Sequence, residues 1–530
     1  MTDPKGATTL VDVMRRRTVL TPDAQYFSLF DETVTYAQIW SRSARYAAGL
    51  AAAGVRAGDK VCLIYPTCAE FFYTFFGALR VGAVPVPLYP TLGVEATAAI
   101  FRDSEAVAVA TIGWFRAGVD ASVALAPNVR QVLEPNELDS DAPAPPDHAE
   151  QPDDLCFLQY TSGSTGQPRG VVLSHANVVE TTKFMSKAAG LSADDRVVSW
   201  LPLYHDMGLI GCALTPPLTA TPIWLLPPDL RNPRPWLETI TKMRATFTVS
   251  PDFGYRNCVR NVRDTSDFDL SSLKAALSGA EPVRTSTIDA FESHFGLKNV
   301  IAPCYGLAEA TLAVAIMPRG MPPRYDASGR WLSVGPPCPG VSLRISEPMR
   351  EGGAVDLVDL PPETEGEICV KSPGVMQGYY NNLEATARVL TADGWLRTGD
   401  LGFMDAEGYL YVTGRLKDVI IVGGKNIVPA DVEEIVDHVP GVRYSAAVGV
   451  DSERTGTQRL YVVAELRDAA DPPATVREIV QRVHRGQGQR PARVLLVQAS
   501  TIPKTSSGKI QRSRLVQMIE AGELAGRVIE

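Results

Sequence analysis

The chain has 530 residues, of which 45% are hydrophobic and 21% are charged. This composition is typical of a folded globular protein and excludes a disordered chain, and the length predicts three or four folding units. The formal net charge of -9 excludes the broad basic surface that nucleic-acid-binding proteins present.

Cysteine usage and the apolar stretches bear on the cell compartment. The eight cysteines are scattered and form no Cys-x-x-Cys pair, which predicts reduced thiols in a cytoplasmic protein. Residues 1–6 lack the charged start and apolar core of a signal peptide. The apolar region 71–89 is interrupted by Arg80 and by prolines, so it predicts a buried helix and strand rather than a membrane span.

Short β-rich runs alternate with helical patterns up to about residue 310. Strands are expected at 61–65, 84–88 and 107–112, and a helix at 68–81. This alternation predicts an α/β fold of parallel sheets with helices on both faces. Residues 134–154 contain eight acidic residues, five prolines and no Lys or Arg, which predicts a solvated linker between two subdomains.

A loop rich in glycine and hydroxyl groups, residues 160–170, separates two apolar runs in the next α/β unit. Strands are expected at 155–160, 170–173 and 196–201, with a helix from Ser174 to about Ala189. Glycines let the backbone approach a ligand, and hydroxyls with free N–H groups can hold an anion. The loop lacks the Gly-Lys-Ser/Thr ending of a Walker A motif. Its composition fits a phosphate-binding loop or a flexible surface turn.

The pattern changes in the C-terminal part of the chain. Short runs separated by turn residues predict a small β-rich subdomain over about 333–412. From about residue 419 a new alternation begins, long enough for a separate domain. It comprises helices expected at 430–438 and 475–484 and strands expected at 445–450, 459–466 and 493–497.

Further segments with the composition of site loops lie far apart along the chain. They are residues 200–209, 278–282, 305–311, 398–400, 414–418 with 423–426, and 503–510. With the loop at 160–170, and in this order, they resemble the motifs of adenylate-forming enzymes: acyl-CoA synthetases, fatty acyl-AMP ligases, peptide-synthetase adenylation domains and luciferases. The resemblance covers essentially the whole chain.

This resemblance implies a domain organisation. Residues 1–414 would form a large domain of two stacked α/β-sheet subdomains plus a small β-barrel-like subdomain. Residues 415–418 would be a hinge, and 419–530 a small mobile α+β domain that carries the catalytic lysine.

The chemistry implied by the resemblance is ATP- and Mg²⁺-dependent activation of a carboxylic acid. The product is acyl-AMP, pyrophosphate is released, and a thiol then takes the acyl group. Two anions must meet, so the site has to supply positive charge and hydrogen-bond donors. The resemblance assigns ATP and AMP binding to Thr161, Ser162, Gly163, Ser164, Thr165, Gly166, Arg169, Gly279, Ala280, Glu281, Tyr305, Gly306, Leu307, Asp400 and Arg415.

Individual roles follow from the same motifs. The hydroxyls and N–H groups of 161–166 would hold the β- and γ-phosphates, and Arg169 stands where relatives have a lysine. Tyr305 would stack on adenine, Asp400 would accept both ribose hydroxyls, and Glu309 would hold Mg²⁺, which prefers oxygen ligands.

The catalytic residues implied are Lys509, His205 and Glu309. Lys509 would bridge the substrate carboxylate and the α-phosphate. Lys417 matches the hinge position, about which the C-terminal domain would rotate after adenylation. The acyl and thiol pocket is assigned to His205, Asp206, Met207, Gly208, Gly423 and Gly424.

Within the superfamily the segments 158–161, 205–210 and 303–311 look most like fatty acyl-AMP ligases. Those enzymes pass the acyl group to the phosphopantetheine of an acyl carrier protein. The stretch 313–333 is short for the insertion linked to suppression of the CoA reaction, so a ligase that uses free CoA on a medium-chain, aryl or polyketide acid remains an alternative. An adenylating enzyme with an unusual acceptor in secondary metabolism is another.

Other classes fit less well. No Gly-x-Ser-x-Gly elbow supports a hydrolase at His205, and the six histidines show no metal-ligand spacing. No charged anchor for an amino-acid substrate is evident, which favours a fatty or other apolar acid. A nucleotide-binding regulatory protein without catalysis is opposed by the presence of Glu309, Asp400, Arg415 and Lys509.

Overall fold

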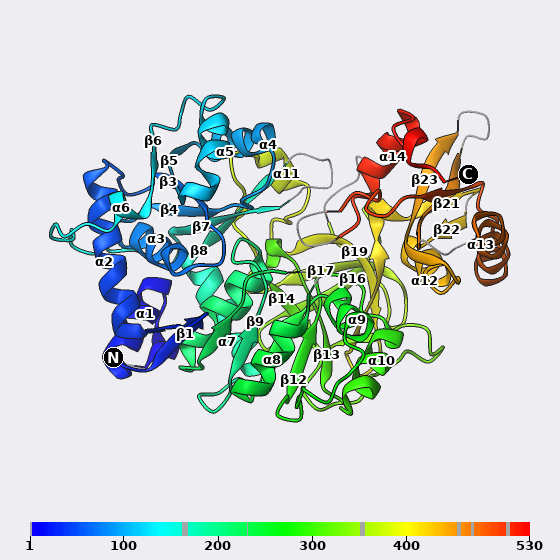
Figure 1. Ribbon diagram of the computed structural model, residues 1–530, viewed down its shortest axis with the longest axis horizontal. Coiled ribbons are helices and arrows are strands. Elements are labelled where there is room, and N and C mark those ends of the chain that lie inside the picture. The colour runs from blue at the N-terminus through cyan, green and yellow to red at the C-terminus, as the bar shows by residue number, and fades with distance from the viewer. Residues whose placement is uncertain are drawn as a thin grey trace.

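The computed structural model describes residues 3–161, 168–229, 232–349, 356–423, 425–452, 457–467, 471–504 and 509–529. Figure 1 shows a large N-terminal body, coloured blue to yellow, and a small C-terminal body in orange and red at its upper right. The α/β class expected from the sequence is confirmed. Within the described ranges, no helix combines the length and apolar character that crossing a membrane requires.

One mixed sheet forms the base of the N-terminal body. Its strands run in the order β14 (Ala313–Ile316), β13 (Ile301–Gly306), β12 (Ala275–Ser278), β11 (Phe247–Ser250), β9 (Val197–Ser199), β10 (Ile223–Leu225), β1 (Gln25–Leu29) and β2 (Glu32–Thr35). The central strands are parallel and almost wholly buried, as expected for a sheet covered by helices on both faces. The edge strands β2 and β14 are antiparallel to their neighbours.

A second, parallel sheet lies in the first part of the chain. Its order is β4 (Val84–Pro87), β3 (Lys60–Ile64), β5 (Ala106–Thr111) and β6 (Gln131–Leu133). Beside it, β7 (Leu155–Thr161) and β8 (Arg169–Ser174) form an antiparallel pair that flanks the glycine-rich loop. The short strand β18 (Gly378–Tyr379) pairs with β8, although the sequence placed residues 378–379 in the β-rich subdomain.

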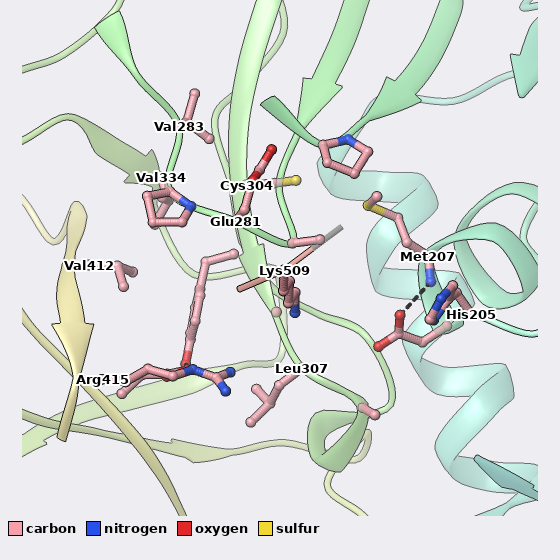
Figure 2. Close-up of a pocket in the computed structure, with 18 of the residues that line it drawn as sticks. His205, Met207, Glu281, Val283, Cys304, Leu307, Val334, Val412, Arg415 and Lys509 are labelled. Atoms are coloured by element: carbon pink, nitrogen blue, oxygen red, sulfur yellow. Dashed lines mark hydrogen bonds and ion pairs between the residues drawn. The ribbon is translucent and has the colours of Figure 1, made fainter. Parts of the chain in front are cut away.

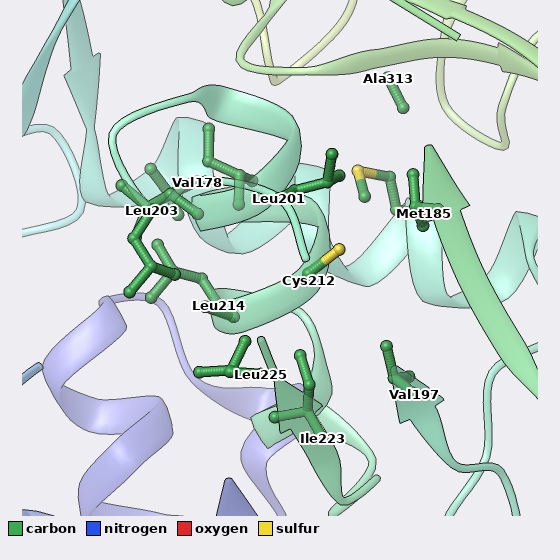
Figure 3. Close-up of a cluster of buried hydrophobic side chains, with 14 of the residues drawn as sticks. Val178, Met185, Val197, Leu201, Leu203, Cys212, Leu214, Ile223, Leu225 and Ala313 are labelled. Carbon is green, nitrogen blue, oxygen red and sulfur yellow. The ribbon is translucent and has the colours of Figure 1, made fainter. Parts of the chain in front are cut away.

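Helices cover these sheets. They are α1 (Leu10–Leu20), α2 (Tyr36–Ala52), α3 (Ala69–Arg80), α4 (Val94–Asp103), α5 (Gly113–Val123), α6 (Pro135–Leu138), α7 (His175–Ala188), α8 (Arg234–Met243), α9 (Asp252–Asn261), α10 (Thr285–Phe295) and α11 (Leu383–Ala387). Helix α7 begins as the sequence predicts, because the Ser174 hydroxyl accepts from Asn177 N–H in a capping box. A π-helix, η2 (Met207–Leu214), packs its apolar residues between α7 and the mixed sheet (Figure 3).

The β-rich part is an antiparallel sheet in the order β15 (Ser333–Gly335), β20 (Leu410–Arg415), β19 (Leu396–Met404), β17 (Gly366–Lys371) and β16 (Ser342–Ser346). The C-terminal body contains β21 (Ile420–Val422), β22 (Lys425–Ile427), α12 (Pro429–Asp437), β23 (Val442–Ser452), β24 (Thr457–Leu466), α13 (Pro472–Gln487), β25 (Arg493–Val497) and α14 (Arg512–Glu520). Its buried side chains form hydrophobic clusters of their own, which is typical of a separate folding unit.

The acidic segment 134–154, expected from its composition to be a solvated linker, connects β6 to β7 and is mostly exposed or partly exposed. It begins with the short helix α6, and its carboxylates then pair with arginines of the first subdomain. Asp139 contacts Arg42 at 2.6 Å, and Asp147 contacts Arg80 at 2.6 Å. The segment is therefore anchored on α2 and α3, because its acids lie next to basic side chains of those helices.

Candidate active site

A cavity of about 3280 Å³ is lined by both α/β units, the antiparallel sheet and the C-terminal body. Most of the residues assigned to the site line it, although they come from distant parts of the chain. They are Thr161, Arg169, His205, Asp206, Met207, Gly208, Ala280, Glu281, Tyr305, Gly306, Leu307, Glu309, Asp400, Arg415, Lys417 and Lys509. Figure 2 shows Lys509 near the middle of this group, with Arg415 on one side and His205 and Met207 on the other.

Other assigned residues either lie outside the described part of the chain or do not line the cavity. Ser162, Gly163, Ser164, Thr165, Gly166 and Gly424 lie outside the described residues. Gly279 lies behind the lining, where a Cβ atom would come within 2.7 Å of Cys304 Sγ. Gly423 is not among the residues that line the cavity. It has φ of 57° and donates its N–H to Thr457 at 3.0 Å.

Asp400 is held from two sides at the junction of β19 and β20. Arg415 lies opposite it in the strand register, and Arg415 Nε is 2.9 Å from Asp400 Oδ1. The Tyr305 hydroxyl donates to Asp400 Oδ2 at 2.7 Å. Burial, with the Asp400 charge next, raises the pKa of Tyr305, so its hydroxyl stays a donor. The sequence predicted Tyr305 as a stacking ring and missed its contact with Asp400.

The turn after β12 carries Ala280 and Glu281. Ala280 has φ of 66°, a left-handed conformation that side chains rarely adopt and that is common at ligand sites. Glu281 Oε1 accepts the Phe253 N–H at 2.6 Å, which ties this turn to α9. Burial, reinforced by Asp252, raises the pKa of Glu281.

Tyr379 connects two assigned residues and was missed by the sequence analysis. Its hydroxyl donates to Glu309 Oε1 at 2.9 Å, and its ring lies 5.2 Å from the Arg169 guanidinium carbon. The pairing of β18 with β8 brings this tyrosine to the site. The sequence alone does not predict that pairing, because a strand of two residues is too short to show the alternation of apolar and polar residues.

Glu309 suits a magnesium ion that arrives with phosphate. The described residues contain no group of three or more His, Cys, Asp or Glu side chains that could hold a metal. Mg²⁺ in phosphoryl-transfer sites is commonly bound by one or two carboxylates plus substrate phosphates. Glu309 lies in the same cavity as Thr161 and Arg169 at the two ends of the phosphate loop, so its carboxylate could serve as the protein ligand of a magnesium ion bound to phosphate.

Lys509 and His205 are both partly buried in the cavity. Burial, followed by repulsion from Arg415, lowers the pKa of Lys509. Burial and the neighbouring Lys509 lower the pKa of His205 to about 4, so the imidazole is neutral near pH 7. Asp206 Oδ1 accepts the Met207 N–H at 2.7 Å at the start of the π-helix, and burial raises the pKa of Asp206. π-helical turns are frequent at functional sites.

Glu367 lies on β17, the strand that pairs with the Asp400 strand β19, and was also missed by the sequence analysis. It forms an ion pair with Arg397, and each side chain is only 4% exposed. Glu367 Oε1 also accepts the Gly399 N–H at 3.0 Å, one residue before Asp400. The part of β19 that presents Asp400 is thus fixed by a buried ion pair.

Replacing Glu367 by glutamine should lower the free energy of unfolding by about 3 kcal/mol, because Arg397 is left as a buried cation without its carboxylate. Urea denaturation measures the change. Glu384→Gln is the matched control, since Glu384 and its partner Arg388 are 79% and 69% exposed and such pairs contribute about 0–1 kcal/mol. Equal losses in both variants would contradict the role given to Glu367.

Comparison with known proteins decides the family. The family model described as AMP-binding enzyme matches residues 14–380. The family model described as AMP-binding enzyme C-terminal domain matches residues 431–509. The chain belongs to the AMP-binding enzyme family. It is therefore an adenylate-forming enzyme of the acid–thiol ligase type, as the sequence motifs indicated, and this family uses ATP.

Within this family, the chain is similar to ligases that act on fatty acids. The chain is 34% identical to the "Long-chain-fatty-acid--AMP ligase FadD26" of Mycobacterium marinum, over 92% of this chain and 91% of that protein. It is 32% identical to the "Medium-chain-fatty-acid--[acyl-carrier-protein] ligase JamA" of Moorena producens, over 86% and 84%. A solved fatty acyl-adenylate ligase, from work on the E. coli and L. pneumophila enzymes, superposes with a TM-score of 0.87 at 28% identity, over 98% and 99%. These similarities support activation of an acid as its adenylate.

Proposed function

We propose that this enzyme activates an apolar carboxylic acid with ATP and transfers the acyl group to the phosphopantetheine thiol of an acyl carrier protein. The observation that carries the proposal is the position of Lys509. This C-terminal lysine lines the same cavity as Asp400, Arg415 and His205, which belong to the N-terminal body. A cation at the position of Lys509 can contact both the substrate carboxylate and the α-phosphate of ATP.

In the first half-reaction a carboxylate oxygen of the acid attacks the α-phosphorus of ATP. The bond from that phosphorus to the bridging oxygen of pyrophosphate breaks, and pyrophosphate leaves with the electron pair. Lys509 lies between the two anions and donates hydrogen bonds to the carboxylate and to the α-phosphate as charge builds up. His205, neutral near pH 7, adds no second cation that would compete for the carboxylate.

The remaining residues hold the nucleotide. Asp400 accepts the two ribose hydroxyls while Arg415 and the Tyr305 hydroxyl keep its carboxylate in place. Tyr305 and the turn at Ala280 border the adenine. The loop at 161–166 with Arg169 holds the β- and γ-phosphates. Glu309 would hold Mg²⁺, which would neutralise phosphate charge and align the leaving group.

The acyl chain is expected in an arm of the cavity between α7, η2 and the mixed sheet. Asp206 adds a carboxylate at the start of η2, and uncharged residues contributed by these elements and their ends line the arm: Met185, Ser186, Ala189, Leu191, Met207, Gly208, Gly211, Phe247, Val249, Leu277, Leu312, Ala313 and Ile316. Figure 3 shows Met185 and Ala313 at one side of the hydrophobic cluster that backs this arm. Such a lining supports a fatty or other apolar acid over an amino acid.

Replacing Gly211 by leucine should shift the preference toward shorter acids. A Cβ atom at Gly211 would lie 3.1 Å from Leu312 Cδ2 and 4.0 Å from Met185 Cε, so a larger side chain fills the arm. We expect kcat/KM for the longest accepted acid to fall at least about 10-fold, since one methylene contributes about 0.8 kcal/mol and several are displaced. The measurement is adenylate formation across a chain-length series.

Gly118→Leu is the matched control, because a Cβ atom at Gly118 meets nothing within 4 Å. The control should leave the chain-length profile unchanged. An unchanged profile in Gly211→Leu as well would remove this arm as the acyl site.

Thiol transfer needs a different arrangement of the C-terminal body. Lys417 lies in the short helix η5 (Leu416–Asp418) that joins the two bodies, where we place the hinge. Rotation there would withdraw Lys509 and bring Gly423 and Gly424 toward the cavity, whose lining does not include Gly423. Two half-reactions could then use one cavity in turn.

Two assays test the proposed function. ATP–pyrophosphate exchange with a panel of acids should show strongest exchange with apolar acids, and no exchange with any acid would refute it. The purified adenylate is then incubated with a holo-acyl carrier protein or with free CoA. Transfer to the carrier supports the proposal, whereas transfer to CoA alone replaces it by an acyl-CoA ligase.

A further inference from the structure

Two arginines of the N-terminal body converge on one acid of the C-terminal body. Arg284 is the N-cap of α10 and its Nη1 lies 2.8 Å from Asp437 Oδ2. Arg256 on α9 brings its Nη1 to 3.9 Å from the same oxygen. The side chains are 17%, 16% and 7% exposed for Arg284, Arg256 and Asp437, so this contact between the bodies is largely shielded from water.

Each partner is held in place by its own body. Asp252 accepts the backbone N–H of Arg284 at 3.1 Å and lies 3.0 Å from Arg256 Nε, which holds the start of α10 and the Arg256 side chain side by side. On the other side the Ser445 hydroxyl donates to Asp437 Oδ1 at 2.7 Å. The groups are therefore fixed before the bodies meet, and less side-chain freedom is lost on contact.

Asp437 is connected to Lys509 through α12. Asp437 ends this helix, and Glu433, one turn earlier, accepts two hydrogen bonds from Arg512 at 2.7 and 2.8 Å. Arg512 follows Lys509 by three residues, and its Nη1 also lies 3.4 Å from Asp418 Oδ2 in the hinge segment. A helix fixed at Asp437 thus fixes the segment that carries Lys509.

We propose that Asp437 is a positioning residue for adenylation: its contact with Arg284 and Arg256 holds Lys509 in the cavity. The proposal rests on the proposed function above. Rotation of the C-terminal body away from α9 and α10 must break this pair, and Arg284 and Arg256 then lie close together without the carboxylate that approaches both guanidinium groups. Removal of one partner of a buried, hydrogen-bonded charge pair is costly. The pair therefore favours the arrangement that adenylates.

The test is Asp437→Asn, with both half-reactions measured separately. We expect kcat for pyrophosphate exchange to fall about 10- to 100-fold, as for loss of a buried charge pair. Acyl transfer from preformed adenylate should stay within about twofold, because it does not use Lys509. Asp451→Asn, an exposed acid on the same body, should change neither rate. Equal loss of both half-reactions, or no loss of exchange, would overturn the proposal.

Amide hydrogen exchange gives a readout that does not depend on activity. In Asp437→Asn, exchange should rise in α9, in the first turn of α10 and in residues 509–515, and should stay unchanged in α2, which packs on α3 and α6 in the first subdomain. No change at these interface segments would also overturn the proposal. If the unmodified enzyme exchanges pyrophosphate with no acid, the proposed function fails, while this measurement still decides whether Asp437 holds the two bodies together.

Discussion

Replacing Lys509 by alanine should lower the rate of ATP–pyrophosphate exchange by about 100- to 1000-fold, the range observed when a single donor that stabilises developing charge is removed. Lys509 is a cation of the C-terminal body that lines the cavity and lies between Arg415 and His205 in Figure 2. Transfer of the acyl group from preformed adenylate should be largely retained, because the lysine acts only in adenylation. Equal loss of both half-reactions would refute the two-arrangement mechanism.

The pH dependence of adenylation in Lys509→Arg tests whether the charge at this position is what the reaction needs. The charged lysine is the active form, so activity is fully present below its pKa and declines as pH rises through it. Burial and Arg415 lower that pKa. The decline of kcat/KM for adenylation should therefore be centred at a pH below 10.5, the ordinary pKa of a lysine. In Lys509→Arg this alkaline decline should move to higher pH, since guanidinium keeps its charge above pH 12. An unchanged decline would assign it to another group.

Replacing Asp400 by asparagine should reduce kcat/KM for ATP by about 100-fold, which corresponds to about 3 kcal/mol for hydrogen bonds to a charged group. The variant loses the negative acceptor for the ribose hydroxyls and leaves Arg415 without its carboxylate partner. Because the ribose is bound in both ground and transition states, KM should carry much of the loss. Adenylation kinetics at varied ATP measure it.

The control for Asp400→Asn is Glu407→Gln on the same hairpin. Glu407 is 64% exposed and pairs with Arg324, away from the ribose site. This variant should keep kcat/KM for ATP within about twofold, as expected of an exposed pair. A comparable loss in both variants would mean that the hairpin as a whole, rather than the Asp400 carboxylate, limits ATP use.

We propose that these residues together let one site bring two anions together. Arg169, Arg415 and Lys509 reach the cavity from three different parts of the fold, and each has an acid or an aromatic ring near it. Their positive charges are thus positioned before substrates arrive, so little reorganisation is needed during the reaction. The proposed role of the Asp437–Arg284 pair is to keep Lys509 in the cavity during adenylation.

Much of the fold could be predicted from local patterns. The helix expected at 68–81 is α3 (Ala69–Arg80), and the strand expected at 493–497 is β25 (Arg493–Val497). Strong periodicity and capping residues such as Ser174 mark such elements. The expected strand 445–450 is shorter than β23 (Val442–Ser452), because hydrogen bonds to β24 extend it beyond its apolar run.

The sequence by itself determined the family, the order of the site loops and a set of site residues most of which line the cavity, because those loops carry their chemistry in short local motifs. Only the tertiary structure decided which strands pair and which charges meet. Tyr379 reaches Glu309 because β18 joins β8, and Asp437 reaches Arg284 across the two bodies. Short apolar runs do not specify their partners, and a single charged side chain looks the same in sequence whether it faces water or another domain.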